Sequence, residues 1–144
     1  MKEMKFEYPI EGGDFDQAGQ ASSSIKKILN QLNLDPVLVR RIAVAMYEAE
    51  VNVVAHAFRG IIKVGINPDR IVVRIEDEGP GSPDIEKAMQ EGYSTASDRV
   101  REMGFGAGMG LSNMKRNSDN LLISSELNKG TVVEMTTCIK SKQQ

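Results

Sequence analysis

The sequence predicts a two-layer α/β sandwich, in which a mixed and largely antiparallel sheet carries helices on one face. Two segments, residues 18–32 and 35–58, have apolar side chains at helical spacing. Five shorter segments have the alternating pattern that is typical of strands. All of these segments share a chain of 144 residues, the size of one ordinary domain. We therefore expect a single domain over residues 1–144, with helices and sheet enclosing one core.

The N-terminal region is expected to form one strand and one helix. Residues 5–10 form the strand, which the glycines at 12–13 end. Asp14 is the expected N-cap of the first helix, and Gln17, three residues later, is its partner in a capping box.

The second helix has the clearest start signal in the chain. Asp35 is its expected N-cap and Pro36 its first residue. It should run to about Phe58, with Gly60 as a stop signal. The later elements are expected to be strands at 61–66 and 71–77 around a turn at 67–69, a short helix at 83–91, a connector at 92–109, a helix at 110–117, and strands at 121–127 and 131–139 joined by 128–130.

Composition excludes several classes of function. The net charge is −2 and the pI about 5.5, which argues against a nucleic-acid partner or an anionic membrane surface. Cys138 and His56 are the only residues of their types, which excludes an intrachain disulfide and a zinc or histidine-based metal cluster. No apolar run reaches the roughly 18 residues that span a bilayer, and the start lacks a signal-peptide core, so a cytoplasmic protein is expected.

The second helix carries an unusual polar stripe. It is apolar nearly all round from residue 43 to 58, yet Glu48, Asn52 and His56 follow one another at intervals of four and so share one face. This stripe either faces solvent or lines a cleft. In a cleft, Glu48 would serve as a base and Asn52 as an oxygen ligand for a cation such as Mg²⁺. Glu50 points elsewhere and is interpreted as ordinary surface.

A carboxylate ends the inward alternation of the strand at 71–77. Val73 and Ile75 share one face, and Asp77 continues it by the period of two. Gly79 and Gly81 follow directly, and glycines let backbone approach a ligand closely. The alternative is a plain strand-to-loop turn with a capping aspartate.

Glycines occupy alternate positions from residue 104 to 110, just before the predicted helix at 110–117. Unhindered N–H groups at a helix N-terminus favour a phosphate. The pattern is neither a P-loop nor a dinucleotide fingerprint, and taken alone it is also compatible with a flexible hinge.

Together these motifs resemble the GHKL ATPases, which include gyrase, Hsp90 chaperones, MutL-type proteins and sensor histidine kinases. Residues 48–52 resemble the family's N box, residues 77–81 its first glycine box and residues 104–110 its second. Gly130 and Thr131 resemble the closing Gly-Thr pair. Order and spacing match from about residue 40 to 135, and the implied fold is the Bergerat ATP-binding fold.

The resemblance implies ATP and Mg²⁺ as cofactors. Asp77 would accept the adenine amino proton, Asn52 would bind Mg²⁺, and Glu48 would be the catalytic base. His56 would pack against or support the site residues and would not transfer a proton. The other implied nucleotide contacts are Gly79, Gly81, Gly104, Gly106, Gly108, Met109, Gly110, Leu111 and Thr131, of which Thr131 would act through water.

In its length the chain resembles the stand-alone anti-sigma-factor serine/threonine kinases. The stretches 77–81, 83–89 and 92–95 are similar to the switch-kinase branch, which phosphorylates small STAS-domain antagonists. The implied function is ATP-dependent phosphorylation of such a partner. One alternative is a nucleotide-gated module that sequesters a sigma factor or activates a phosphatase without catalysis. A homodimer also stays open, as does the role of Arg99 and Arg101, which either reach the γ-phosphate or form a solvated surface.

Overall fold

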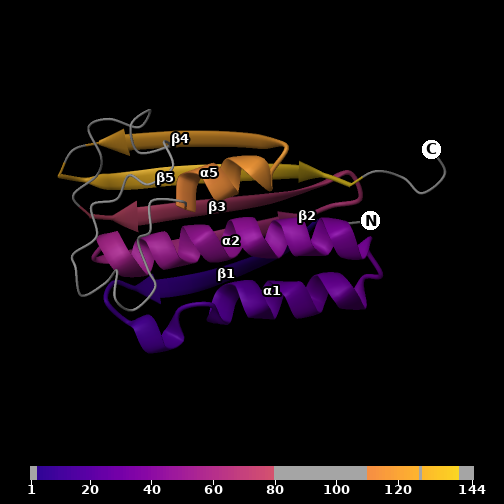
Figure 1. The fold of residues 1–144 in the computed structure, drawn as a ribbon, viewed down its shortest axis with the longest axis horizontal. Helices are drawn as coiled ribbons and strands as arrows, with labels where there is room; N and C mark the ends of the chain where they lie inside the picture. Colours follow the sequence, from indigo (N-terminus) through magenta and orange to yellow (C-terminus); the bar gives the residue numbers. More distant parts are fainter. Residues whose placement is uncertain (1–2, 80–109, 127, 140–144) are drawn as a thin grey trace.

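The computed structural model describes residues 3–79, 110–126 and 128–139. Its strands form one sheet in the order β1-β2-β3-β5-β4 (Figure 1). Each of the four neighbouring pairs in this order is antiparallel. The elements in chain order are β1 (Met4–Glu11), the 3-10 helix η1 (Phe15–Gln17), α1 (Gln20–Gln31), α2 (Pro36–His56), β2 (Arg59–Ile66), β3 (Arg70–Glu78), α5 (Gly110–Arg116), β4 (Asn120–Glu126) and β5 (Gly130–Cys138).

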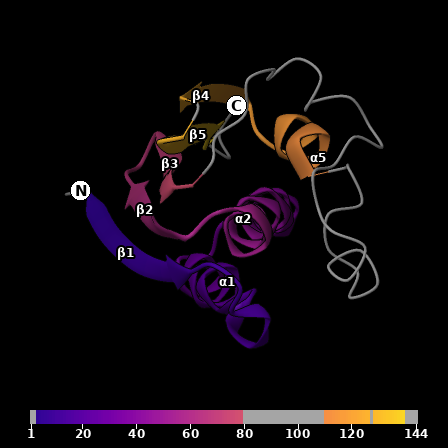
Figure 2. The same cartoon turned by 90° about the vertical axis from the view of Figure 1, so that its left-hand side faces the viewer.

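The described helices lie on one face of the sheet, which confirms the predicted α/β sandwich. Figure 2 shows the sheet curving around α2, with α1 beside β1 and α5 on the side of β4. The core lies between the layers, and α2 is buried widely because it contacts the sheet and both other helices. The least exposed apolar side chains of this core include Ile25, Leu29, Met46, Val53, Ile62, Val64, Ile71, Ile75 and Met114.

The opposite face of the sheet carries a ladder of charges. Glu76 lies 3.3 Å from the Lys63 ammonium and 2.7 Å from Arg74 Nε. Arg74 also reaches Glu134 on β5 at 3.0 Å. These pairs are partly exposed, so they stabilise the sheet only modestly, but they explain why these strands alternate between apolar and charged residues.

The first helix begins later than the capping box predicts. Asp14 precedes only the short η1, and its side chain makes no capping hydrogen bond. The α-helix starts at Gln20 after Gly19, whose φ of 96° is in the left-handed region. Gly19 has no side chain that could accept a hydrogen bond from the first N–H groups of the helix. The prediction was wrong because the acceptor for this helix start comes from another helix, as described below.

The start of α2 and the β2–β3 hairpin confirm the predictions from local sequence. Asp35 Oδ1 accepts the N–H of Val37 at 2.9 Å, and Pro36 is the first helical residue. In the turn, Asn67 Oδ1 accepts the N–H groups of Asp69 and Arg70 at 2.8 and 2.9 Å. Because each contact joins residues within three positions, local chemistry was enough to predict it.

Other predictions fall outside the described residues. They are the short helix at 83–91, the connector at 92–109, Gly81, Arg99, Arg101, and the residues Gly104, Gly106, Gly108 and Met109 of the second glycine box. Gly110 and Leu111 form the start of α5, which ends at Arg116 rather than residue 117. No described helix is long and apolar enough to cross a membrane.

Candidate functional site

Asp77 lies at the end of β3 on the face that is covered by the helices. It follows the buried Val73 and Ile75 with the expected period of two and is itself half-buried. Its Oδ1 accepts the backbone N–H of Thr131 on β5 at 3.0 Å, whereas Oδ2 accepts no hydrogen bond from the described residues. Burial raises the pKa of the Asp77 carboxyl, and the Thr131 hydrogen bond opposes this shift.

Two glycines on neighbouring strands pack close against Asp77. Gly60 pairs with Asp77 across the β2–β3 ladder, and a Cβ there would lie 3.3 Å from Asp77 Cβ and 3.0 Å from Val53 Cγ1. Gly130 has a φ of 151°, and a Cβ there would overlap the Asp77 carbonyl oxygen. Gly60 is therefore a strand residue that fits close against Asp77, and its prediction as a helix stop was wrong.

Thr131 contacts Asp77 through its backbone rather than its hydroxyl group. Its Oγ1 instead lies 2.9 Å from Ser125 Oγ, the residue opposite it on β4. This Ser125–Thr131 pair lies on the helix side of the sheet, because Thr131 is in phase with the buried Val133 and Met135. No pattern in the sequence points to Ser125, since only the register of β4 against β5 places it there.

The polar stripe of α2 is half-buried, so it is neither fully exposed to solvent nor fully enclosed in a cleft. Glu48, Asn52 and His56 are each partly exposed. Glu48 Oε1 accepts a hydrogen bond of 3.4 Å from Asn113 Nδ2 on α5. Burial lowers the pKa of the His56 imidazole below its ordinary value. The stripe thus faces the side of α2 where α5 packs, and Asn113 is a neighbour that no sequence pattern indicates.

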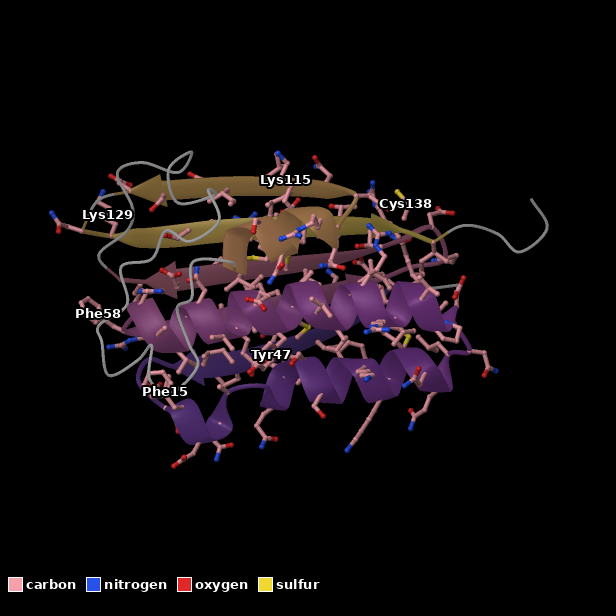
Figure 3. All side chains as sticks on the ribbon, viewed as in Figure 1. Phe15, Tyr47, Phe58, Lys115, Lys129 and Cys138 are labelled. Carbon is pink, nitrogen blue, oxygen red and sulfur yellow. The ribbon has the colours of Figure 1, made fainter. Side chains whose placement is uncertain are left out.

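The end of β3 and the C-terminal end of α2 are packed tightly together. Gly79 is buried, and a Cβ there would lie 3.0 Å from Ala57 Cα and 3.5 Å from the His56 carbonyl oxygen. Its N–H donates to the carbonyl oxygen of Lys129 at 3.1 Å. Figure 3 shows Phe58 and Lys129 at this same end of the molecule, far from Cys138. The structure therefore brings Asp77, the first glycine of its motif and the helix of Glu48 and Asn52 to one region.

Glu50 is not a surface residue as predicted. Its side chain is wholly buried, at 0% exposure. Its two oxygens accept the N–H groups of Ala21 and Ser22, each at 3.1 Å. Because Gly19 has no side chain, Glu50 supplies from α2 the cap that α1 lacks. The prediction failed because α2 buries a second face against α1, which the spacing within α2 alone does not reveal.

A hollow of about 390 Å³ lies beside Glu50, between β1, η1 and α1. Its lining includes Tyr8, Asp14, Gln17 and Ser24, and it contains none of the predicted nucleotide contacts. It is therefore separate from the region around Asp77.

Two side chains of this region offer groups that suit a nucleotide with its metal ion. No group of three or more His, Cys, Asp or Glu side chains within 3–79, 110–126 and 128–139 could hold a metal ion. Magnesium commonly takes one or two protein oxygens together with substrate phosphates. Asn52 can provide such an oxygen, while Asp77 Oδ2, which has no partner among the described residues, can accept an amino hydrogen.

Comparison with known proteins decides the family. The model of the histidine kinase-like ATPase domain matches residues 13–137, which is most of the chain. The chain belongs to this family. Its relatives include the anti-sigma F factor of Thermoanaerobacter sp. (strain X514), which is 38% identical over 115 residues that cover 75% of this chain and 77% of the relative.

Two further members of the family show the same range of similarity. The anti-sigma F factor of Geobacillus stearothermophilus is 32% identical over 118 residues, covering 76% of this chain and 77% of the relative. The serine/threonine-protein kinase RsbT of Bacillus subtilis (strain 168) is 31% identical over 113 residues, covering 76% of this chain and 79% of the relative. The resemblance to this family that the motifs indicated is therefore confirmed.

Proposed function

We propose that this member of the histidine kinase-like ATPase family is an ATP-dependent serine/threonine protein kinase of the anti-sigma regulatory type. The observation that carries the proposal is Asp77, a half-buried carboxylate with one oxygen held by Thr131 N–H and the other without a partner among the described residues. The relatives support it by their names, which are anti-sigma F factor and serine/threonine-protein kinase.

Asp77 accounts for selection of adenine. A purine amino group donates hydrogen bonds, and the ionised Asp77 Oδ2 can only accept them. The Thr131 N–H fixes the carboxylate plane through Oδ1. Gly60 and Gly130 let the neighbouring strands pack close against Asp77, because any side chain at either position would press on Asp77 or its surroundings. Guanine carries a carbonyl oxygen at C6, where adenine has its amino group, so this oxygen would face the Asp77 acceptor and guanine would be rejected.

Asn52 and Glu48 account for the chemistry on the neighbouring helix. Bound Mg²⁺, held through the Asn52 side-chain oxygen, would neutralise charge on the phosphates. Glu48 takes the proton from a serine or threonine hydroxyl of the partner. The hydroxyl oxygen then forms the new bond to the γ-phosphorus, the bond to the β-γ bridging oxygen breaks, and ADP leaves. Such a base contributes about 10²–10⁴-fold to the rate.

The acceptor that we propose is a small STAS-domain antagonist. A second function, nucleotide-gated sequestration of a sigma factor, is supported by the two relatives that are named anti-sigma F factor. The two functions differ in their need for Glu48. A sigma-binding module needs nucleotide but no base, whereas a kinase needs both.

Two substitutions test the proposal. Calorimetry with Mg-ATP should give binding to the wild type and to Glu48→Ala, and none to Asp77→Asn, whose amide presents a donor to the adenine amino group. Phosphotransfer from radiolabelled ATP to the STAS-domain protein encoded nearest this gene should be lost in Glu48→Ala. If the wild type gives no heat with Mg-ATP, nucleotide binding is wrong. If Glu48→Ala phosphorylates the partner at the normal rate, Glu48 is not the base.

A further inference from the structure

Asn113 makes a side-chain contact to Glu48 from a different helix. Asn113 lies in α5, and its Nδ2 donates to Glu48 Oε1 at 3.4 Å across 65 positions of sequence. A glutamate side chain that is partly exposed samples several rotamers unless a contact holds it in one place. A fixed donor at one oxygen therefore decides where the other oxygen points.

The orientation of the Asn113 amide is itself fixed by a second contact. Arg116 Nη2 donates to Asn113 Oδ1 at 3.2 Å. A guanidinium can only donate and an ionised carboxylate can only accept, so both partners require the same orientation of the amide. The Arg116–Asn113–Glu48 chain thus runs in one direction, from cation through amide to carboxylate.

The backbone around Asn113 packs against α2. Met114, the next residue, is fully buried in the core. The Asn113 carbonyl oxygen accepts both the backbone N–H of Asn117, at 3.1 Å, and its side-chain amide, at 2.9 Å. Nearby, Arg41 of α2 pairs with Asp119 at 3.3 Å. Asn113 is therefore presented to Glu48 from an element whose position relative to α2 is determined by packing.

We propose that Asn113, oriented by Arg116, is a positioning residue that holds Glu48 Oε1 so that Oε2 faces the hydroxyl group of the protein substrate. The inference rests on the proposed function, because it assigns a purpose to the base of that reaction. A base whose geometry is set by a third group is a recurring arrangement in nucleophile activation. Asn113 itself touches neither nucleotide nor acceptor in this scheme.

The expected effect of Asn113→Ala is a loss of turnover without a loss of nucleotide binding. Misplacement of a catalytic group by about 1 Å costs up to roughly 10²-fold in rate, so kcat for phosphotransfer should fall by about 10–100-fold. The KM for Mg-ATP should stay within about twofold, because Asp77 and Asn52 are unchanged. Arg116→Ala should give a smaller loss in the same direction. Lys115→Ala, an exposed position on the same helix (Figure 3), is the matched control and should keep the wild-type rate.

A double-mutant cycle separates positioning from general damage to α5. In single-turnover assays, Asn113→Ala should slow the wild type but change nothing in a Glu48→Gln background, because the residue acts only through Glu48. Asn113→Asp, which has nearly the same shape but places a carboxylate against Glu48, should be at least as slow as Asn113→Ala. Thermal unfolding of each variant reports whether the fold is intact.

The outcomes distinguish this inference from the proposed function. The inference is overturned if Asn113→Ala and Asn113→Asp keep the wild-type kcat, or if Asn113→Ala slows the Glu48→Gln enzyme by the same factor as the wild type. In either case, loss of transfer in Glu48→Ala would leave the kinase proposal standing. If the wild type transfers no phosphate, or Glu48→Ala transfers it normally, the kinase proposal and the role of Asn113 are both wrong.

Discussion

Glu50→Ala should be among the most destabilising substitutions in the chain. The wholly buried Glu50 carboxylate accepts two N–H groups at the start of α1, from Ala21 and Ser22. In the alanine variant both donors are left without an acceptor inside the protein. The negative charge also complements the positive end of the α1 dipole, and this contribution is lost with it.

The size of the effect follows from these two donors. Each unsatisfied buried donor costs about 1–3 kcal/mol, so the pair costs roughly 2–6 kcal/mol before any water enters the space. We expect a loss of about 3–5 kcal/mol, in the upper part of this range because both donors are buried and lose their acceptor together. Domains of this kind have roughly 5–15 kcal/mol of total stability. Glu50→Gln keeps one acceptor oxygen and should be intermediate, at about 2–3 kcal/mol.

Urea unfolding followed by far-ultraviolet circular dichroism measures this directly. With a denaturant slope of about 1–3 kcal/mol per molar, Glu50→Ala should lower the midpoint by roughly 2 M. Hydrogen exchange should become faster at the Ala21 and Ser22 amides before the rest of α1 is affected. Glu48→Ala is the matched control, since it removes a half-buried carboxylate from the same helix and should cost less than about 1 kcal/mol. An equal effect of the two substitutions, or a loss below 1 kcal/mol in Glu50→Ala, would refute the capping role.

The remaining predictions concern the region around Asp77 and His56. Gly130→Ala should destabilise the fold by at least about 1–3 kcal/mol and weaken Mg-ATP binding, both measurable by calorimetry, because its methyl group would overlap the Asp77 carbonyl oxygen; unchanged binding and stability would contradict this. Adenosine affinity should fall on acidification, because a protonated Asp77 oxygen becomes a donor that faces the adenine amino group. The pH at which half of the affinity is lost should lie above the ordinary aspartate pKa of 3.8, since burial raises the pKa of Asp77. Burial lowers the pKa of His56 from 6.5, so the unfolded chain binds more protons and the free energy of unfolding should decrease as pH falls below 6.5. Urea titrations at several pH values should show that the free energy of unfolding of His56→Gln depends less on pH than that of the wild type. An identical pH dependence in the two proteins would exclude His56 as its source.

The nucleotide-site residues divide into those that a local pattern predicts and those that it does not. The period of two along β3 placed Asp77 on the helix side, and the interval of four along α2 placed Glu48, Asn52 and His56 on one face. The catalytic, metal and nucleotide roles of these residues remain predictions. Asn113 carries no such pattern, because its contact with Glu48 depends on how α5 packs against α2.

The sequence by itself determined the features that act over a few residues. Asp35 and Pro36 start α2, Asn67 closes the β2–β3 turn, and alternation assigns the inner face of each strand. Each of these features depends only on the local backbone geometry and on side chains a few residues away, so the sequence is enough to predict it. Only the tertiary structure decided that Glu50 caps α1, that Gly60 lies against Asp77, and that Asn113 reaches Glu48. The physical reason is that a buried polar group must be satisfied by whatever acceptor or donor packing brings near, and the identity of that neighbour is a property of the assembled layers rather than of either segment.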